Sequence, residues 1–134
     1  MGRILIVEDD ERRCSWFSNQ FAKFELDTTA DVSLAIEWLL QREYDLIFLD
    51  HDLALEHYEQ ELADDGLTGY VVASWLAEHP ECQPGVQIII HSLNFPGSDR
   101  MRQCLQNAGR DAEHVPFPYL PSLLSSRRSA NRKD

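Results

Sequence analysis

The sequence predicts an α/β fold built on a single doubly wound, five-stranded parallel sheet. Apolar runs alternate with amphipathic segments about five times along the chain, which is typical of a parallel sheet with helices on both faces. The apolar runs are nearly continuous, as in strands that are buried on both sides. A chain of 134 residues with 43% hydrophobic content is the size of one domain with its own core.

The first half of the chain contains three expected strands and two expected helices. Phe17, Phe21 and Phe24 recur at helical spacing, and Asp31 is a suitable N-cap for the helix that follows it. The expected elements are a strand at 3–8, a helix at 11–24, a strand at 25–29, a helix from 32 to about 40 and a strand at 45–50.

The second half begins with a polar stretch that reaches to about Gly66. Pro80 limits the first helix of this half, and Gly109 is a typical residue for ending the second. The expected elements are a helix at 70–76, a strand at 86–91, a turn with a helix cap at Pro96-Gly97-Ser98, a helix over the apolar stripe 101–108, a strand at 113–117 and a weak helix at 122–126.

We interpret residues 1–126 as one domain and residues 127–134 as a basic, disordered tail, because the tail is polar and poor in apolar side chains. No apolar stretch approaches the roughly 20 residues needed to cross a bilayer. The chain also starts directly with an expected strand and not with the pattern of a signal peptide. We therefore expect a cytoplasmic protein that has no membrane partner.

The charge of the chain excludes a broad surface for duplex nucleic acid. The formal net charge is −11, and four of the twelve basic residues lie in the last eight positions, so the body of the chain is strongly acidic. Such a field repels a polyphosphate backbone. A compact site that meets a phosphate through a divalent cation is compatible with this charge, because the cation reverses the local sign.

Three of the expected strands end in polar side chains that bind metal ions or move protons. These are Glu8 and Asp9 after the first strand, Asp50, His51 and Asp52 after the third, and His91 and Ser92 after the fourth. In open α/β sheets, ligands bind at the carboxyl ends of the strands. The sequence therefore predicts that these side chains form one site.

The residue types at this edge suggest metal-assisted chemistry on a phosphate ester. Asp9 and Asp50 are expected to hold one Mg²⁺ or Mn²⁺, and we include Glu8 and Asp52 among the candidate ligands. An imidazole titrates near neutral pH, so His51 and His91, together with Asp50, are the candidate catalytic residues for proton transfer. The candidate groups for binding the phosphate are the side chains of Ser92 and Asn94 and the backbone amides of Gly97 and Ser98.

Each of these residues also has a structural interpretation. Acids after a strand often cap a turn or a helix, and a histidine at a strand end is often buried and hydrogen-bonded. Successive side chains of a strand point to opposite faces, so His51 joins a site with Asp50 only if the chain bends there.

The same residues carry a resemblance to the receiver domains of response regulators. Arg3–Asp10 resembles their first strand, with Glu8 and Asp9 as the acidic pair, Asp50 resembles their phospho-accepting aspartate, and Ser92 resembles the hydroxyl residue after the fourth strand. The resemblance covers roughly residues 3–118. It implies a flavodoxin-like sheet with strand order 2-1-3-4-5.

The sequence departs from receivers after the last expected strand. Receivers carry a lysine before a proline there, whereas this chain has no lysine between Lys23 and Lys133, and Pro116 or Phe117 takes that place. Arg100 and Arg102 are candidates to replace the lost cation. The resemblance also suggests a cis peptide bond at Pro116 or Pro118, and the sequence does not decide between the alternatives.

A derived receiver family is closer still. The segments that carry this similarity are Leu49-Asp50-His51-Asp52-Leu53, Thr68-Gly69, His91-Ser92-Leu93-Asn94 and Pro96-Gly97. They are similar to the cyclic-phosphate-processing receiver domains, whose proposed role is to act on cyclic phosphates in nucleotides or RNA ends.

These observations favour a metal-dependent phosphoesterase that processes a cyclic or terminal phosphate of a nucleotide or an RNA end. The alternative is a signalling domain that accepts a phosphoryl group on Asp50, or an atypical receiver that binds a partner protein without phosphorylation. A third hypothesis is a sensor that binds a nucleotide without turnover. These readings differ in their partner, which is a small phosphate ester in the first and a signalling protein in the second.

Overall fold

The computed structural model describes residues 2–53 and 68–123. The predicted tail at 127–134, most of the polar stretch before Gly66 and the end of the weak helix at 122–126 lie outside the described residues. Within the described ranges, the helices are too short or too polar to cross a membrane.

The described strands form one parallel sheet in the order β2-β1-β3-β4-β5. The strands are β1 (Arg3–Val7), β2 (Glu25–Thr29), β3 (Leu46–Leu49), β4 (Gln87–Ile90) and β5 (Asp111–His114). This confirms the predicted fold class and strand order. β5 starts two residues earlier than expected.

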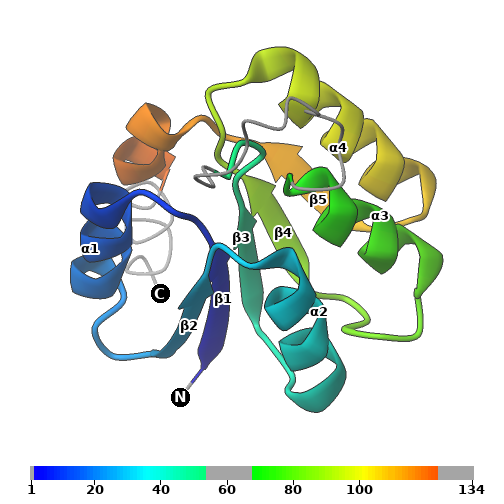
Figure 1. Cartoon of the computed structure of the whole chain (residues 1–134), viewed down its shortest axis with the longest axis horizontal. Helices are drawn as coiled ribbons and strands as arrows, with labels where there is room; N and C mark the ends of the chain where they lie inside the picture. The colour runs from blue at the N-terminus through cyan, green and yellow to red at the C-terminus, as the bar shows by residue number, and fades with distance from the viewer. Residues whose placement is uncertain (1, 54–67, 124–134) are drawn as a thin grey trace, which may run out of the picture.

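Helices cover both faces of this sheet, as Figure 1 shows. The helix α1 (Glu11–Gln20) and residues 117–123 lie on one side, and α2 (Val32–Gln41), α3 (Tyr70–Glu78) and α4 (Phe95–Asn107) lie on the other. Alternate strand residues feed two separate cores. Val7, Leu49 and Ile90 pack toward α2, α3 and α4, whereas Ile6, Phe48 and Ile89 pack toward α1.

The helix boundaries follow from their caps. The carboxylates of Asp10 and Asp31 accept hydrogen bonds from the first amides of α1 and α2, which confirms the cap predicted at Asp31. The expected helix at 11–24 ends at Gln20, and Phe24 lies beyond it and is exposed. The periodic phenylalanines therefore extend past the helix that they predicted.

The turn expected at residues 96–98 is instead the first turn of α4. Asn94 is the N-cap of this helix. Pro96 lies in its first turn, where a backbone N–H has no acceptor within the helix. After β5, Phe117–Tyr119 form a short 3₁₀ helix. Every peptide bond within the described ranges is trans, including those at Pro116 and Pro118.

The side chain of Arg110, directly before β5, is hydrogen-bonded to the end of α3 and the loop after it. Its guanidinium is almost fully buried and donates hydrogen bonds to backbone carbonyl oxygens only. The acceptors are Leu76, His79, Cys82 and Gln83, at distances of 2.6 to 3.2 Å. Leu76, His79 and Gln83 also accept a hydrogen bond from a backbone amide, so Arg110 adds a second donor to these carbonyls and links the loop after α3 to the start of β5.

Replacing Arg110 with Met is expected to destabilise the protein by about 2–4 kcal/mol, because several buried carbonyls lose a donor. The free energy of unfolding in urea measures this change. Arg102→Met is the matched control, since Arg102 pairs with the exposed Asp99 on its own helix, and it should shift stability by less than about 0.5 kcal/mol. Equal effects of the two substitutions would contradict the role given to Arg110.

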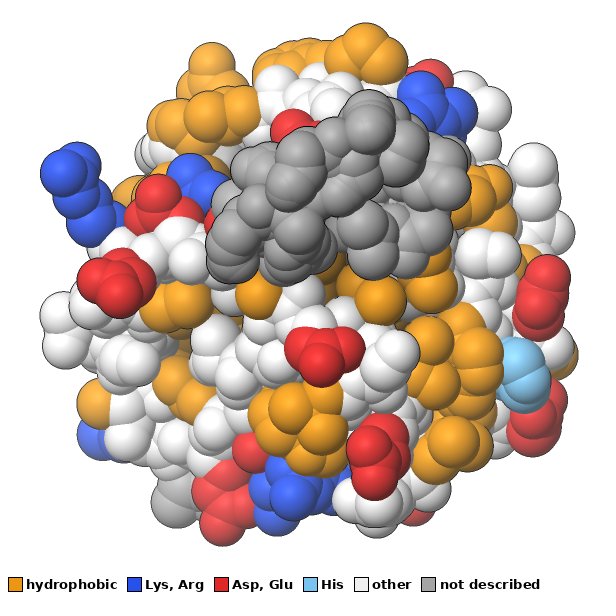
Figure 2. All heavy atoms as spheres, in the orientation of Figure 1, with side chains coloured by type: hydrophobic (Ala, Val, Ile, Leu, Met, Phe, Trp, Pro, Cys, Tyr) orange, Lys and Arg blue, Asp and Glu red, His pale blue; other side chains and the backbone are white. Residues whose placement is uncertain are grey.

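The surface agrees with the charge of the sequence. Figure 2 shows acidic and basic side chains scattered over the visible face, and the described residues there form no continuous basic patch.

Candidate functional site

The site begins with three polar residues that lie in a row across the sheet. Val7, Leu49 and Ile90 are the last residues of β1, β3 and β4, and Leu49 pairs with Val7 on one side and with Ile90 on the other. The residues that follow them therefore lie side by side in the same order. These residues are Glu8, Asp50 and His91, and all three are buried.

Strand alternation turns this row toward α1. Val7, Leu49 and Ile90 face the other helices, so the residues that follow them face the same side as Ile6, Phe48 and Ile89. One ligand atom from each of Glu8, Asp50 and His91 lies within 4.8 Å of the other two. We call these three residues the buried row.

His91 is buried among aromatic side chains and contacts Glu8 through one of its ring nitrogens. Its ring is 1% exposed and packs edge-on against the rings of Phe17, Phe48 and Phe117. Its Nε2 lies 2.7 Å from Oε1 of Glu8, and its Nδ1 has no hydrogen-bond partner within the described ranges. Burial lowers the pKa of His91, so we assign a neutral ring that donates from Nε2.

Glu8 carries the negative charge of this pair. Burial alone would raise the pKa of Glu8, but hydrogen bonds from His91 and Arg13 outweigh it and hold the pKa at about 2. The carboxylate also accepts hydrogen bonds from the backbone amides of Asp9 and Asp10. Glu8 is therefore ionised and fixed in position.

Arg13 of α1 is a member of the site that the sequence analysis did not identify. Its Nε and Nη2 donate to the two carboxylate oxygens of Glu8 at 3.0 and 2.9 Å, and Nη2 lies 3.6 Å from Oδ2 of Asp50. Side chains of a helix point back toward its N-terminus, so a residue in the first turn of α1 reaches the strand end before it. That spacing, five residues after Glu8, is the signal that could have found it.

Asp50 is the group whose charge is least well compensated. Burial and the neighbouring charge of Glu8 raise the pKa of Asp50 to about 7, although Arg13, the backbone amide of His51 and the hydroxyl of Ser92 oppose this shift. A carboxyl group with this pKa exchanges its proton near neutral pH.

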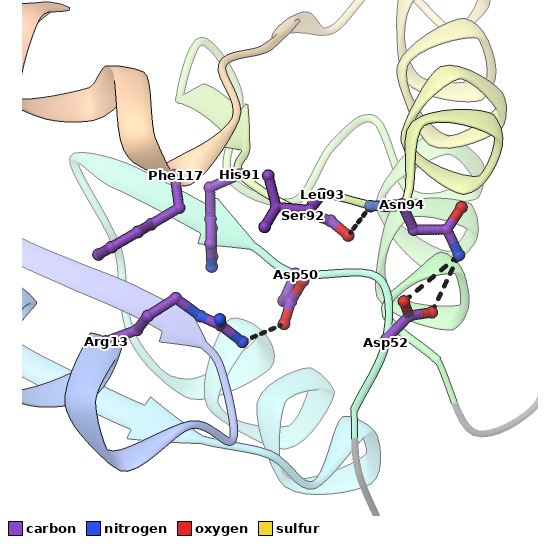
Figure 3. A pocket seen from close by; sticks show the side chains of 8 residues that line it. All are labelled: Arg13, Asp50, Asp52, His91, Ser92, Leu93, Asn94 and Phe117. Carbon is purple, nitrogen blue, oxygen red and sulfur yellow. Dashed lines mark hydrogen bonds and ion pairs between the residues drawn. The ribbon is translucent and has the colours of Figure 1, made fainter.

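The buried row opens into a cavity of about 450 Å³. Figure 3 shows Arg13 reaching from α1 toward Asp50, with His91 and Phe117 on one wall and Asn94 joined to Asp52 on the other. The lining residues are Arg13, Asp50, Asp52, His91, Ser92, Leu93, Asn94 and Phe117. The volume is in the range of pockets that bind small organic molecules.

His51 lies outside this lining set, on the opposite face of the sheet edge. Its Nδ1 is 2.7 Å from Oδ1 of Asp52, and its ring packs against the backbone of Gly97 at the start of α4. Asn94 completes the network by donating from Nδ2 to Asp52 at 3.0 Å. The geometry makes His51 a residue that positions Asp52 and Asn94, and it does not support the predicted direct proton transfer by His51.

Two of the four predicted phosphate-binding residues line the cavity and two do not. Ser92 and Asn94 line the cavity, and the hydroxyl of Ser92 accepts a hydrogen bond from the amide of Asn94. The amides of Gly97 and Ser98 already donate to Oδ1 and the backbone carbonyl of Asn94. Because these two N–H groups are used in capping α4, the prediction that they bind the phosphate is not supported.

The predicted metal ligands are likewise divided. Glu8 and Asp50 belong to the buried row, and His91 joins them in place of Asp9 and Asp52. The side chain of Asp52 is 66% exposed and lies at the mouth of the cavity. Asp9 and His51 are outside this group of ligand atoms.

Of the two residues predicted to take the place of the receiver lysine, Pro116 and Phe117, the apolar Phe117 belongs to the cavity wall. Phe117 lines the cavity, and its amide donates to the carbonyl oxygen of His91 at 2.9 Å. The guanidinium of Arg13 lies 5.9 Å from the centre of the Phe117 ring. The cation of this site therefore comes from α1, and neither Arg100 nor Arg102 lines the cavity.

Gly97→Ala is expected to destabilise the protein by about 1–3 kcal/mol, because a Cβ at this position would lie 2.6 Å from Cδ2 of His51. The same change at an ordinary helical glycine stabilises by about 0.5–1 kcal/mol. In a His51→Ala background the obstruction is gone. A double-mutant cycle on unfolding free energies should therefore give a coupling of at least about 1 kcal/mol, and additive effects would contradict the contact.

Asp50→Asn is expected to change the pH dependence of stability. The folded pKa of Asp50 is about 7, above its ordinary value of 3.8, so between these values the folded protein holds a proton that the unfolded chain releases. Asp50 therefore lowers stability as the pH rises, and the variant lacks this loss.

Urea unfolding in the presence of a chelator measures this effect. The stability of the Asp50→Asn variant relative to the wild type should rise by about 2–3 kcal/mol between pH 5 and pH 8. The contribution of His91, which has the opposite sign, is common to both proteins. A stability difference that does not change with pH would contradict the raised pKa of Asp50.

Solved structures with the same fold are receivers. A CheY-like receiver domain protein from Methanospirillum hungatei JF-1 is 19% identical, with 99% of this chain and 98% of that chain covered and a TM-score of 0.64. TrrA from Thermotoga maritima, in complex with Mg²⁺-BeF, is 20% identical, with 96% and 98% covered and a TM-score of 0.66. A Burkholderia pseudomallei response regulator with a phosphorylated aspartic acid is 14% identical, with 98% and 73% covered and a TM-score of 0.63.

No curated protein matches this chain. The model of one family, described as the cyclic-phosphate processing receiver domain, matches residues 4–107. This range contains the whole buried row, Arg13 and the cap of α4. The chain therefore belongs to the family of cyclic-phosphate processing receiver domains.

Proposed function

We propose that this domain is a metal-dependent phosphoesterase that acts on a cyclic or terminal phosphate of a nucleotide or an RNA end. The observation that carries this proposal is the buried row Glu8–Asp50–His91 at the base of a cavity of about 450 Å³. A cavity of this volume accommodates more than a phosphoryl group.

The donor set of the buried row fits a divalent cation. Two carboxylates and one imidazole have ligand atoms within 4.8 Å of one another, and His91 keeps a ring nitrogen without a hydrogen-bond partner within the described ranges. Carboxylates suit Mg²⁺ and Mn²⁺, and an imidazole in the set favours Mn²⁺. When bound, the ion would stabilise negative charge on the phosphoryl oxygens.

Asp50 is the member of the buried row with the least compensated charge, and it lines the cavity. We assign it to holding the ion beside the substrate phosphate. Its raised pKa belongs to the ion-free site, because a bound cation would favour the ionised carboxylate. In the ion-free protein, His91 holds Glu8 through Nε2–H. To ligate the ion through Nε2, the ring would carry its proton on Nδ1 instead, the nitrogen that has no hydrogen-bond partner within the described ranges.

The rest of the cavity favours an organic phosphate over the free anion. Ser92 and Asn94 place polar side chains on one side, and Leu93 and Phe117 contribute apolar surface. Apolar walls with a few polar groups are typical of pockets for small molecules. A ribose or a base would contact these walls while the phosphate lies near Asp50.

With a 2′,3′-cyclic nucleotide and Mn²⁺, we expect steady-state turnover that Asp50→Asn lowers by at least about a hundredfold, because the ion loses a carboxylate ligand. Removal of the ion with a chelator should abolish turnover. The control is Asp111→Asn, which changes an exposed aspartate at the far end of β5 and should keep the wild-type rate. Product release measured by chromatography follows the reaction. Turnover that survives both Asp50→Asn and the chelator would contradict the proposal.

A second candidate function is the acceptance of a phosphoryl group on Asp50. Its support is the position of Asp50 directly after β3 in a receiver fold. In this reading the partner is a signalling protein. Incubation with acetyl phosphate and Mg²⁺ would leave a stoichiometric, hydroxylamine-sensitive modification on Asp50. A modified protein without turnover of any cyclic phosphate would select this function over the first.

A further inference from the structure

The cavity contains one cationic side chain among its described lining residues, and it is Arg13. The sequence has only two lysines, Lys23 and Lys133, and neither belongs to a described wall of the cavity. Other arginines are engaged elsewhere: Arg102 with Asp99, and Arg110 with backbone carbonyls. Among the residues that the structure describes, Arg13 is therefore the candidate guanidinium partner for a phosphate in this cavity.

Arg13 is held so that part of its guanidinium stays available. Nε and one N–H of Nη2 are used by the two carboxylate oxygens of Glu8. A guanidinium has five N–H donors in a fixed plane, so Nη1 and the second N–H of Nη2 remain. The second N–H of Nη2 is on the side of Asp50, at 3.6 Å. The bidentate pair with buried Glu8 fixes the plane of these donors before any ligand binds.

We propose that Arg13 is the phosphate-binding residue of this cavity and takes over the task of the lysine that the chain lacks. Glu8 orients the guanidinium, and Phe117 supports it from the other side, with the guanidinium carbon 5.9 Å from the ring centre. The remaining N–H donors bind phosphoryl oxygens above Asp50. This inference rests on the proposal that the cavity binds a phosphate ester, and it is independent of whether the ester is turned over.

The local charges specify when Arg13 binds a phosphate. Glu8 and ionised Asp50 carry two negative charges against one positive charge on Arg13, so the cavity alone repels an anion. A divalent cation on the buried row reverses this balance. Arg13 and the ion are thus both required for phosphate binding, but Arg13 opposes the ion because both are attracted to the same carboxylates.

This arrangement predicts effects of opposite sign for Arg13→Gln. Calorimetry with Mn²⁺ alone should show binding at least as tight as in the wild type, because a competing positive charge is removed. Inorganic phosphate added to the Mn²⁺-loaded protein should bind at least tenfold more weakly than to the loaded wild type. Arg13→Lys, which keeps the charge but not the bidentate geometry, should recover part of the phosphate affinity.

The matched control is Arg12→Gln, which removes an exposed charge from the preceding position of α1 and should bind both ions as the wild type does. Three results would overturn the proposal. These are equal phosphate affinity of Arg13→Gln and the wild type, a parallel loss of Mn²⁺ and phosphate binding in Arg13→Gln, and no phosphate binding by the loaded wild type. A wild type that binds phosphate through Arg13 but turns over no ester would support the role of Arg13 and refute the phosphoesterase alone.

Discussion

The burial of two neighbouring carboxyl groups is the constraint on which this site depends. Glu8 and Asp50 end adjacent central strands and face the same side of the sheet, where solvent does not screen their repulsion. The protein offsets the charge on Glu8 with two partners, Arg13 and His91. It leaves Asp50 with a longer ion pair to Arg13, at 3.6 Å, and a raised pKa. The acidity of Glu8 and the basicity of Asp50 therefore have one common cause.

The fold supplies those partners through α1. Asp10 caps this helix directly after β1, so its first turn must lie over the ends of the central strands. Arg13 reaches the carboxylates from that turn. Phe17, one turn later on the same helix face, packs against the ring of His91 and closes the apolar side of the site. One helix therefore both compensates the charge and excludes water.

The sequence was sufficient to predict which strand ends meet. Glu8, Asp50 and His91 each follow an apolar run, and parallel strands bring their carboxyl ends to one edge. The sequence was a less reliable guide to the face of the sheet on which each side chain lies. Alternation across the register places Glu8, Asp50 and His91 on one side, and His51 lies on the other, against Gly97. Predicting this requires exact strand ends, and sequence patterns locate strand ends only to within one or two residues. The start of α4 was missed for a similar reason, because Pro96 and Gly97 are typical of turns as well as of a first helical turn.

Arg13 could not be predicted with the same ease. Its neighbour Arg12 is chemically identical, and only the exact first residue of α1 decides which of them faces the sheet. Helical arginines near an acidic strand end are ordinarily solvated, so residue type alone gives no preference. The structure selects Arg13 because the cap at Asp10 fixes the phase of the helix.

A crystal structure of the Mn²⁺-soaked protein tests the central claim most directly. The account predicts an anomalous-scattering peak within coordination distance of Glu8, Asp50 and His91, with the guanidinium of Arg13 still paired with Glu8. An ion bound only by Asp52 at the cavity mouth would contradict it.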